Sequence, residues 1–232
     1  MIKGIIFDKD GTLFDFNATW GAWAQAMLQA EAGDDAALFA ALAEVLGFDP
    51  LTERFLPESV VIAGTVDTVA DHLLSVIPQM SKPDLIARMN AGAAQLAQVE
   101  AVPLIPYFKG LRALGLRLGI ATNDAEGPAR AHLRRAGVID DFDFIAGYDS
   151  GHGAKPESGQ LLGFVAQTGI APGECAMVGD SLHDLVAGRA AGMLTIGVLT
   201  GPARRPELAP HADVVLDTIA AIPDWLAAEN LI

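Results

Sequence analysis

The sequence predicts an α/β fold in which a parallel β-sheet carries helices on both faces and an all-helical domain is inserted near its start. A short apolar run at residues 2–7 is followed by a long segment, residues 16–102, in which apolar residues recur at helical spacing. From residue 103 onward, short apolar runs alternate with helical stretches, as in a parallel sheet. The chain has 232 residues, 51% of them hydrophobic, so it can bury a sizeable core.

The first expected element is a strand at residues 2–7, which is almost entirely apolar and should therefore be covered on both faces. The insert then shows three helical stretches: one beginning at Asn17 or Thr19, one over residues 66–76 and one beginning at Ser81. Two prolines within residues 102–106 favour a linker that leads back to the sheet. We therefore predict a core formed by residues 1–15 and 103–232, with a helical cap at residues 16–102.

Helices and strands alternate after this linker. The expected helices are residues 107–114, 129–136, 157–168, 182–191 and 219–228. The expected strands are residues 116–121, 142–147, 175–178, 194–198 and 214–216. This order predicts a Rossmann-like sheet. The loop at residues 201–206, which is rich in proline and arginine, should be a solvated surface turn.

The charge balance narrows the range of partners. The chain has 15 Lys and Arg against 29 Asp and Glu, a net charge of −14, which disfavours nucleic acid and anionic membrane surfaces. No apolar stretch approaches the roughly 20 residues that a membrane span needs. The single Cys175 excludes an internal disulfide and fits a reducing compartment, so a cytoplasmic protein is expected.

Polar residues follow three of the expected strands. Asp8 follows the first strand, Thr122 follows the strand at 116–121, and Asp180 comes shortly after the strand at 175–178. The carboxyl ends of parallel strands share one edge of the sheet, where ligands bind. Crowded carboxylates such as Asp8, Asp10 and Asp180 tolerate one another around a hard divalent cation, and Mg²⁺ prefers such oxygen ligands.

Four sequence blocks resemble the haloacid dehalogenase-like superfamily, specifically its phosphoglycolate-phosphatase-like members with a helical cap. They are Asp8-Lys9-Asp10-Gly11-Thr12, Thr122-Asn123, Gly153-Ala154-Lys155-Pro156 and Gly179-Asp180-Ser181-Leu182-His183-Asp184. Their order, spacing and strand context agree over nearly the whole chain. One departure is Ser158, where many relatives carry Pro.

The resemblance implies a role for each acidic residue of the first block. Asp8 would be the nucleophile that forms an aspartyl-phosphate, which water can hydrolyse. Asp10 would be the general acid and base that protonates the leaving oxygen and later activates water. Asp8, the backbone carbonyl of Asp10 and Asp180 would bind Mg²⁺.

The remaining matched residues would bind phosphate or support the metal ligands. By resemblance, Thr122 and the backbone of Asn123 would hold phosphate oxygens, and Lys155 would neutralise phosphate and Asp8. Thr12 and Asp184 would lie behind the metal ligands. A second reading of Asp184 stays open, because an acid in the first turn of a helix is favoured by the helix dipole. His152 and His183 lie in motif loops and are expected to be solvated, with contact between His183 and the substrate left open.

These residues predict a Mg²⁺-dependent phosphatase for a small phosphomonoester, either phosphoglycolate-like or a sugar phosphate. The insert at residues 16–102 would exclude water and select the organic part of the substrate. Candidates for contacting the substrate are Asn17, Trp20, Arg54 and Lys82.

Other functions were weighed against this one. A hexose-phosphate mutase of the same superfamily stays open, because it would keep Asp10. A 2-haloacid dehalogenase needs neither Mg²⁺ nor an acid at position 10, so Asp10 and Asp180 argue against it. A phosphonatase would need a lysine from the cap and usually lacks Asp10. A receiver-type phosphotransfer module also combines carboxylates, Thr, Lys and Mg²⁺, but it is much shorter and has no helical insert.

Overall fold

The protein contains a six-stranded sheet with the strand order β5-β4-β1-β6-β7-β8, described here from a computed structural model that covers all 232 residues. The strands are β1 (Gly4–Phe7), β4 (Arg117–Ala121), β5 (Phe144–Ala146), β6 (Cys175–Gly179), β7 (Leu194–Val198) and β8 (Val214–Leu216). Every neighbouring pair is parallel. The predicted α/β, Rossmann-like sheet is confirmed.

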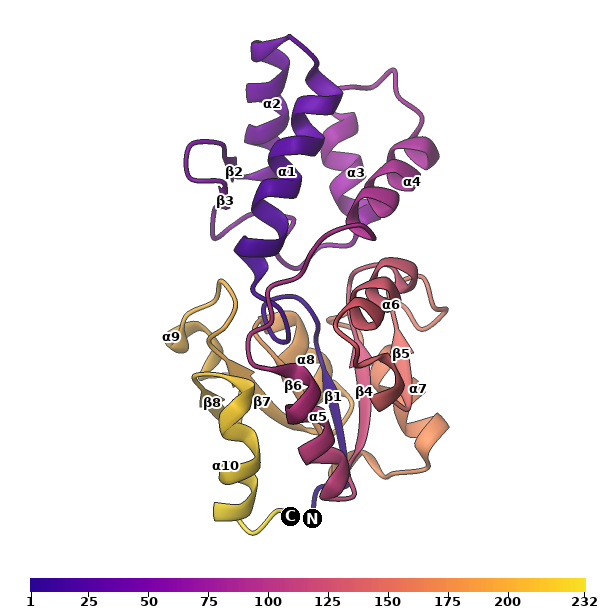
Figure 1. The fold of residues 1–232 in the computed structure, drawn as a ribbon, viewed down its shortest axis with the longest axis vertical. Coiled ribbons are helices and arrows are strands. Elements are labelled where there is room, and N and C mark those ends of the chain that lie inside the picture. Colours follow the sequence, from indigo (N-terminus) through magenta and orange to yellow (C-terminus); the bar gives the residue numbers. More distant parts are fainter.

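Helices cover both faces of this sheet (Figure 1). One face packs against α5 (Leu104–Ala113), α6 (Glu126–Arg135) and α10 (Ile222–Ala228), and the other against α7 (Gly159–Thr168) and α8 (Leu182–Ala190). In β1, Ile5 and Phe7 enter the first layer, whereas Ile6 enters the second. Such alternation explains why this central strand is apolar along its whole length.

The insert has its own hydrophobic cluster, separate from those around the sheet. Its helices are α1 (Phe16–Ala32), α2 (Ala36–Leu46), α3 (Val66–Leu74) and α4 (Lys82–Ala93). It also holds a short antiparallel hairpin, β2 (Phe48–Asp49) and β3 (Arg54–Phe55), so the expectation of an insert made only of helices was wrong in this detail. Figure 1 shows these helices above the carboxyl edge of the sheet, with both chain termini at the opposite end.

Two expected boundaries also differ. Helix α1 begins at Phe16, because the Asp15 side chain accepts a hydrogen bond from the Ala18 N–H at 2.8 Å and caps the helix ahead of Asn17. The expected linker at 102–106 already contains the first turn of α5, where Pro106 costs little because a first-turn residue needs no intrahelical N–H bond.

The remaining elements are short. They are the 3₁₀ turns η1 (Ile139–Asp141), η2 (Pro172–Glu174) and η3 (Ile219–Ala221) and the helix α9 (Arg205–Leu208). Helix α9 begins within the loop at residues 201–206, which was expected to be a surface turn. No helix combines the length and apolar character that a membrane crossing requires.

Candidate active site

The site forms where β1, β4 and β6 end side by side. Phe7 pairs in register with Ile120 of β4 and with Val178 of β6, so the residues that follow these strands emerge together. A cavity of about 740 Å³, including its opening to solvent, lies between this edge and the insert. The predicted residues that line it are Asp8, Asp10, Thr122, Asn123, Lys155, Asp180 and Asp184. Thr12, the eighth, is fully buried beside them.

Lys155 joins two of the carboxylates. Its Nζ lies 2.6 Å from Oδ1 of Asp8 and 2.6 Å from Oδ1 of Asp184. Burial disfavours the charge of Lys155, but the carboxylates of Asp184 and Asp8 outweigh burial and raise its pKa. The other oxygen of Asp184 accepts hydrogen bonds from the Ser181 N–H at 3.0 Å and the Ser181 hydroxyl at 2.7 Å. Asp184 therefore does two things: it caps α8, as an acid in the first turn of a helix can, and it also holds Lys155 in the site.

Asp180 lies in a space that two glycines leave open. A Cβ atom on Gly11 would fall 2.4 Å from Oδ2 of Asp180, and one on Gly201 would fall 1.7 Å from it. Thr12 Oγ1 donates to Oδ1 of Asp180 at 3.3 Å. Burial, reinforced by the negative charges of Asp8 and Asp184, raises the pKa of Asp180 well above its ordinary value. Asp180 thus has little room to move and lacks a cation of its own.

The same carboxylates suit a divalent metal ion. One oxygen from each of Asp8, Asp180 and Asp184 lies within 4.8 Å of the others, and all three residues are buried. Burial, with repulsion from Asp184 and Asp10, raises the pKa of Asp8 from 3.8 to about 7, against the opposing effect of Lys155. Three buried carboxylates with one lysine leave uncompensated negative charge, so this donor set fits a hard cation such as Mg²⁺. The Asp10 side chain lies outside this group.

Asp10 instead contacts a buried lysine that the sequence reasoning did not identify. Lys9 is fully buried, and its Nζ lies 2.5 Å from Oδ2 of Asp10, 3.1 Å from Nδ1 of His132 and 3.4 Å from Oδ2 of Asp124. Burial is the largest single effect and opposes ionisation of Asp10, but the charges of Lys9 and His132 and the hydrogen bond from Lys9 together outweigh it and lower the pKa of Asp10. Burial raises the pKa of Asp124 to about 6 and lowers that of His132 to about 4.

Asn123 and Gln160 hold the loops in place. The Asn123 amide accepts from the Lys155 N–H at 2.8 Å and donates to the Lys155 carbonyl at 2.9 Å. It also donates to the carbonyl of Ala63 in the insert at 2.8 Å. The buried Gln160 amide donates to the carbonyls of Thr122 and Gly153. The Asn123 side chain therefore positions Lys155. The sequence had predicted only that the backbone of Asn123 would hold phosphate.

The loop after β7 is not the solvated turn that was expected. Thr200 Oγ1 donates to the carbonyl of Gly11 at 2.7 Å, and Gly201 lies against Asp180. Only its later part, residues 204–206, is exposed. Glycine followed by proline is common in surface turns, so no local signal marked this contact.

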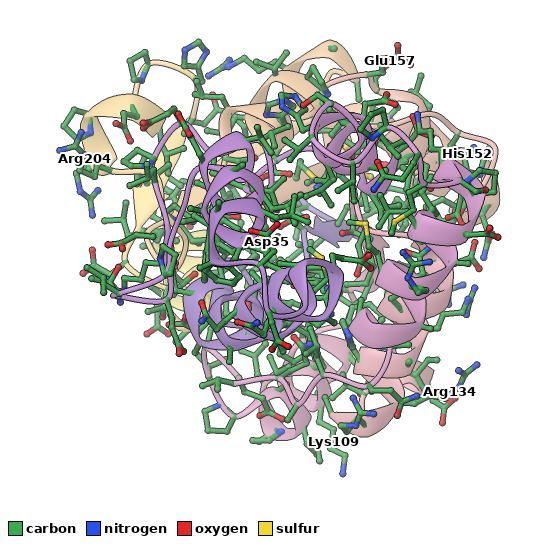
Figure 2. All side chains as sticks on the ribbon, turned by 90° about the horizontal axis from the view of Figure 1, so that it is seen from above. Asp35, Lys109, Arg134, His152, Glu157 and Arg204 are labelled. Carbon is green, nitrogen blue, oxygen red and sulfur yellow. The ribbon has the colours of Figure 1, made fainter.

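Some of the histidines in the motif loops and of the candidate substrate contacts in the insert line the cavity, and others do not. His183 lines the cavity, and burial lowers its pKa. His152 is exposed and lies at the rim of the molecule (Figure 2). Of the candidates in the insert only Trp20 lines the cavity, because Arg54 is exposed and Lys82 pairs with Asp67 and Asp71. Asn17 does not line it either.

The chain is similar in sequence to known hydrolases. The haloacid dehalogenase-like hydrolase family matches residues 2–192 of the chain. A phosphoglycolate phosphatase from Rhodospirillum rubrum is 30% identical over 232 residues, covering 97% of this chain and 91% of its own length. One from Yersinia pseudotuberculosis is 31% identical over 239 residues, covering 99% of this chain and 94% of its own.

Solved structures agree with the fold. A predicted phosphoglycolate phosphatase from Haemophilus somnus superposes with a TM-score of 0.75 at 18% identity, over 97% of each chain. A β-phosphoglucomutase from Clostridium difficile gives a TM-score of 0.68 at 19% identity over the full length of both chains. At these identities the two structures establish the fold alone. The family match over most of the chain, together with relatives about 30% identical over nearly their whole length, shows that the protein belongs to the haloacid dehalogenase-like hydrolases and is an enzyme that resembles those named phosphoglycolate phosphatase.

Proposed function

We propose that the protein is a Mg²⁺-dependent phosphatase that hydrolyses a small phosphomonoester through an aspartyl-phosphate on Asp8. The observation that carries the proposal is the group of buried carboxylates around Lys155, at the shared end of three parallel strands. Residues 1–15 and 103–232 would form the catalytic core, and residues 16–102 the cap. The single buried Cys175 fits an enzyme of the cytoplasm.

The first step transfers the phosphoryl group to Asp8. Lys155 contacts Oδ1 of Asp8, which leaves Oδ2 to form a bond to phosphorus while the bond to the substrate oxygen breaks. The departing oxygen takes a proton from Asp10, which lines the same cavity. An incoming phosphate dianion raises the pKa of Asp10 and so favours the protonated form that this step needs.

The second step releases phosphate. Asp10, whose pKa Lys9 holds low in the free enzyme, is a carboxylate and takes a proton from water. The water oxygen bonds to phosphorus as the bond to Asp8 breaks, which regenerates the Asp8 carboxylate. The Lys155 ammonium and the backbone N–H of Asn123 would stabilise negative charge on the transferring group.

The metal ion would be held by the side chains of Asp8 and Asp180 with the backbone carbonyl of Asp10, and Thr12 and Asp184 would fix these ligands from behind. When bound, Mg²⁺ would compensate the buried carboxylates and polarise the phosphoryl oxygen. A structure of a related hydrolase from Deinococcus radiodurans, 25% identical over 100% of this chain and 97% of that chain with a TM-score of 0.68, contains phosphate and sodium. The phosphate and sodium bound in that related structure support the proposal that this protein binds both an anion and a cation.

Phosphate release from p-nitrophenyl phosphate tests this function. Treatment with EDTA should stop the reaction and added Mg²⁺ should restore it, whereas Ca²⁺, with its larger and looser shell, should substitute poorly. The Asp8→Asn variant should lose on the order of 10⁴-fold in kcat and form no phosphoenzyme. The matched control is Asp140→Asn, an exposed acid outside the cavity that should remain fully active.

Two results would refute the proposal. One is Asp8→Asn retaining more than about a tenth of wild-type turnover, which would remove the nucleophile from the scheme. The other is halide release from 2-haloacids that EDTA does not affect, which would favour a dehalogenase.

A further inference from the structure

The cavity has two chemically different walls. The core supplies ten of its 22 lining residues, including five aspartates. The insert supplies the other twelve, of which ten are hydrophobic and the remaining two are Gly64 and Asn90. The large members of the hydrophobic set are Phe16, Trp20, Trp23, Ile62, Val66 and Met89. A ligand whose phosphate meets the aspartate and lysine wall must place its organic part against the apolar wall.

The insert places no Lys or Arg side chain in the lining of the cavity. Arg54, Lys82 and Arg88 are the only Lys and Arg residues of the insert, and none lines the cavity. Lys82 pairs with Asp67 and Asp71, and Arg88 pairs with Glu31 at 2.9 Å.

The core offers no free cation for a second anionic group either. Lys155 is the one Lys or Arg that lines the cavity, and it lies 2.6 Å from each of its two carboxylate partners. Lys9 does not line the cavity, because it is fully buried and pairs with Asp10.

We propose that the substrate is the phosphate monoester of a small uncharged alcohol with an aromatic or aliphatic body, and that the insert selects against substrates with a carboxylate. The inference rests on the proposed phosphatase activity. A carboxylate carried away from the phosphate would be desolvated against hydrophobic side chains without a partner, and the five nearby aspartates would repel it. An apolar body would instead bury its surface against Trp20, Trp23 and Met89.

The proposed substrate differs from phosphoglycolate, after which the relatives are named. Phosphoglycolate carries a carboxylate one carbon from its phosphate ester, so the inference predicts that it is a poor substrate of this protein. A hexose phosphate is also a poor match. It would need several hydrogen-bond partners along the insert, and Asn90 is the one polar side chain there apart from the indole N–H groups of the two tryptophans.

The test compares esters with equivalent leaving groups. Benzyl phosphate and 4-carboxybenzyl phosphate differ in one carboxylate far from the reacting phosphorus. We expect kcat/KM for benzyl phosphate to exceed that for 4-carboxybenzyl phosphate and for phosphoglycolate by about tenfold or more. Benzylphosphonate should likewise inhibit more strongly than phosphonoacetate, which separates binding from the chemical step.

A gain of function tests the missing cation directly. Asn90→Arg places a guanidinium on the apolar wall and should shift the ratio of kcat/KM values toward 4-carboxybenzyl phosphate by about tenfold. Ala91→Arg is the matched control, because Ala91 is an exposed neighbour on the same helix that does not line the cavity. It changes net charge equally and should leave the ratio unaltered.

The outcomes are distinguishable. Equal or higher kcat/KM for 4-carboxybenzyl phosphate or phosphoglycolate would overturn the substrate inference while leaving the phosphatase proposal intact. An equal shift in both arginine variants would also overturn it, because a general charge effect would then explain the selectivity. Failure to hydrolyse every ester, including p-nitrophenyl phosphate with Mg²⁺, would overturn both proposals.

Discussion

Replacing Gly201 with alanine should damage the site, although Gly201 belongs to none of the four motif blocks. The new Cβ would lie 1.7 Å from Oδ2 and 2.3 Å from Cγ of Asp180, whereas real Cβ contacts do not fall below 3.0 Å. The carboxylate oxygen would therefore have to retreat by about 1.3 Å (3.0 − 1.7). Gly11 also lies close to this carboxylate and limits the room for it to move, so the strain must displace either Asp180 or the loop after β7.

The expected cost follows from this displacement. A misplacement of about 1 Å in a reacting group reduces the rate on the order of 10²-fold, and a disturbed ligand environment weakens metal affinity roughly 10- to 100-fold. We therefore expect Gly201→Ala to lower kcat/KM about 10²-fold at low Mg²⁺. The Mg²⁺ concentration for half-maximal activation should rise about 10- to 100-fold, and high Mg²⁺ should recover part of the loss.

The assay measures initial rates against Mg²⁺ concentration for wild type, Gly201→Ala and Gly110→Ala. The last is the control, because a Cβ on Gly110 meets nothing within 4 Å, and alanine in this helix should stabilise the protein slightly. Circular dichroism checks that each variant folds. If the activation curve of Gly201→Ala matches that of wild type within about twofold, the glycine is not needed to seat Asp180 and our reasoning is wrong.

Two further predictions concern buried charges. In metal-free protein the raised pKa of Asp8, about 7, means that its contribution to stability is fully present below pH 3.8 and is lost as pH rises through about 7. The unfolding free energy of wild type relative to Asp8→Asn should therefore fall between about pH 4 and pH 7, and added Mg²⁺ should stabilise wild type more at pH 8 than at pH 5; a difference that is constant with pH would contradict this. Lys9→Met leaves the carboxylates of Asp10 and Asp124 buried without their cation and should cost about 3–5 kcal/mol in urea unfolding, with partial recovery in Lys9→Met/Asp124→Asn. A loss below about 1 kcal/mol, or no recovery, would show that this network does not support the fold.

The residues at the strand ends could be predicted because their position follows from topology. A parallel sheet gathers the carboxyl ends of its strands at one edge, so Asp8, Thr122 and Asp180 were expected together without any distance information. The structure places them in one cavity with Lys155 and Asp184. The roles assigned to these residues stay predictions, which the variants above test.

Other features left no pattern in the sequence. The strands of the β2–β3 hairpin are two residues each, too short for alternation to show. Gly201 acts through the absence of a side chain, which matters only once Asp180 is known to lie against it. Lys9 and His132 are in contact although they lie 123 positions apart in the chain. Nothing in the sequence around either residue predicts that the other lies beside it. Contacts of this kind depend on tertiary packing and cannot be predicted from local spacing.

Two of the hydrogen bonds that join the insert to the core also connect it to the two buried lysines. The Ala63 carbonyl accepts from Asn123, which holds the backbone of Lys155, and the Ala93 carbonyl lies 2.7 Å from Nε2 of His132, whose other nitrogen lies beside Lys9. Each such bond contributes only about 0.5–1.5 kcal/mol net, so these two contacts alone would not prevent the proposed cap from lifting to release product. Closure of the proposed cap would form these contacts together with the apolar wall, so the same movement would set the position of the organic part of the substrate and the placement of both lysines. The substrate selectivity that we infer from the insert would then act on turnover as well as on binding.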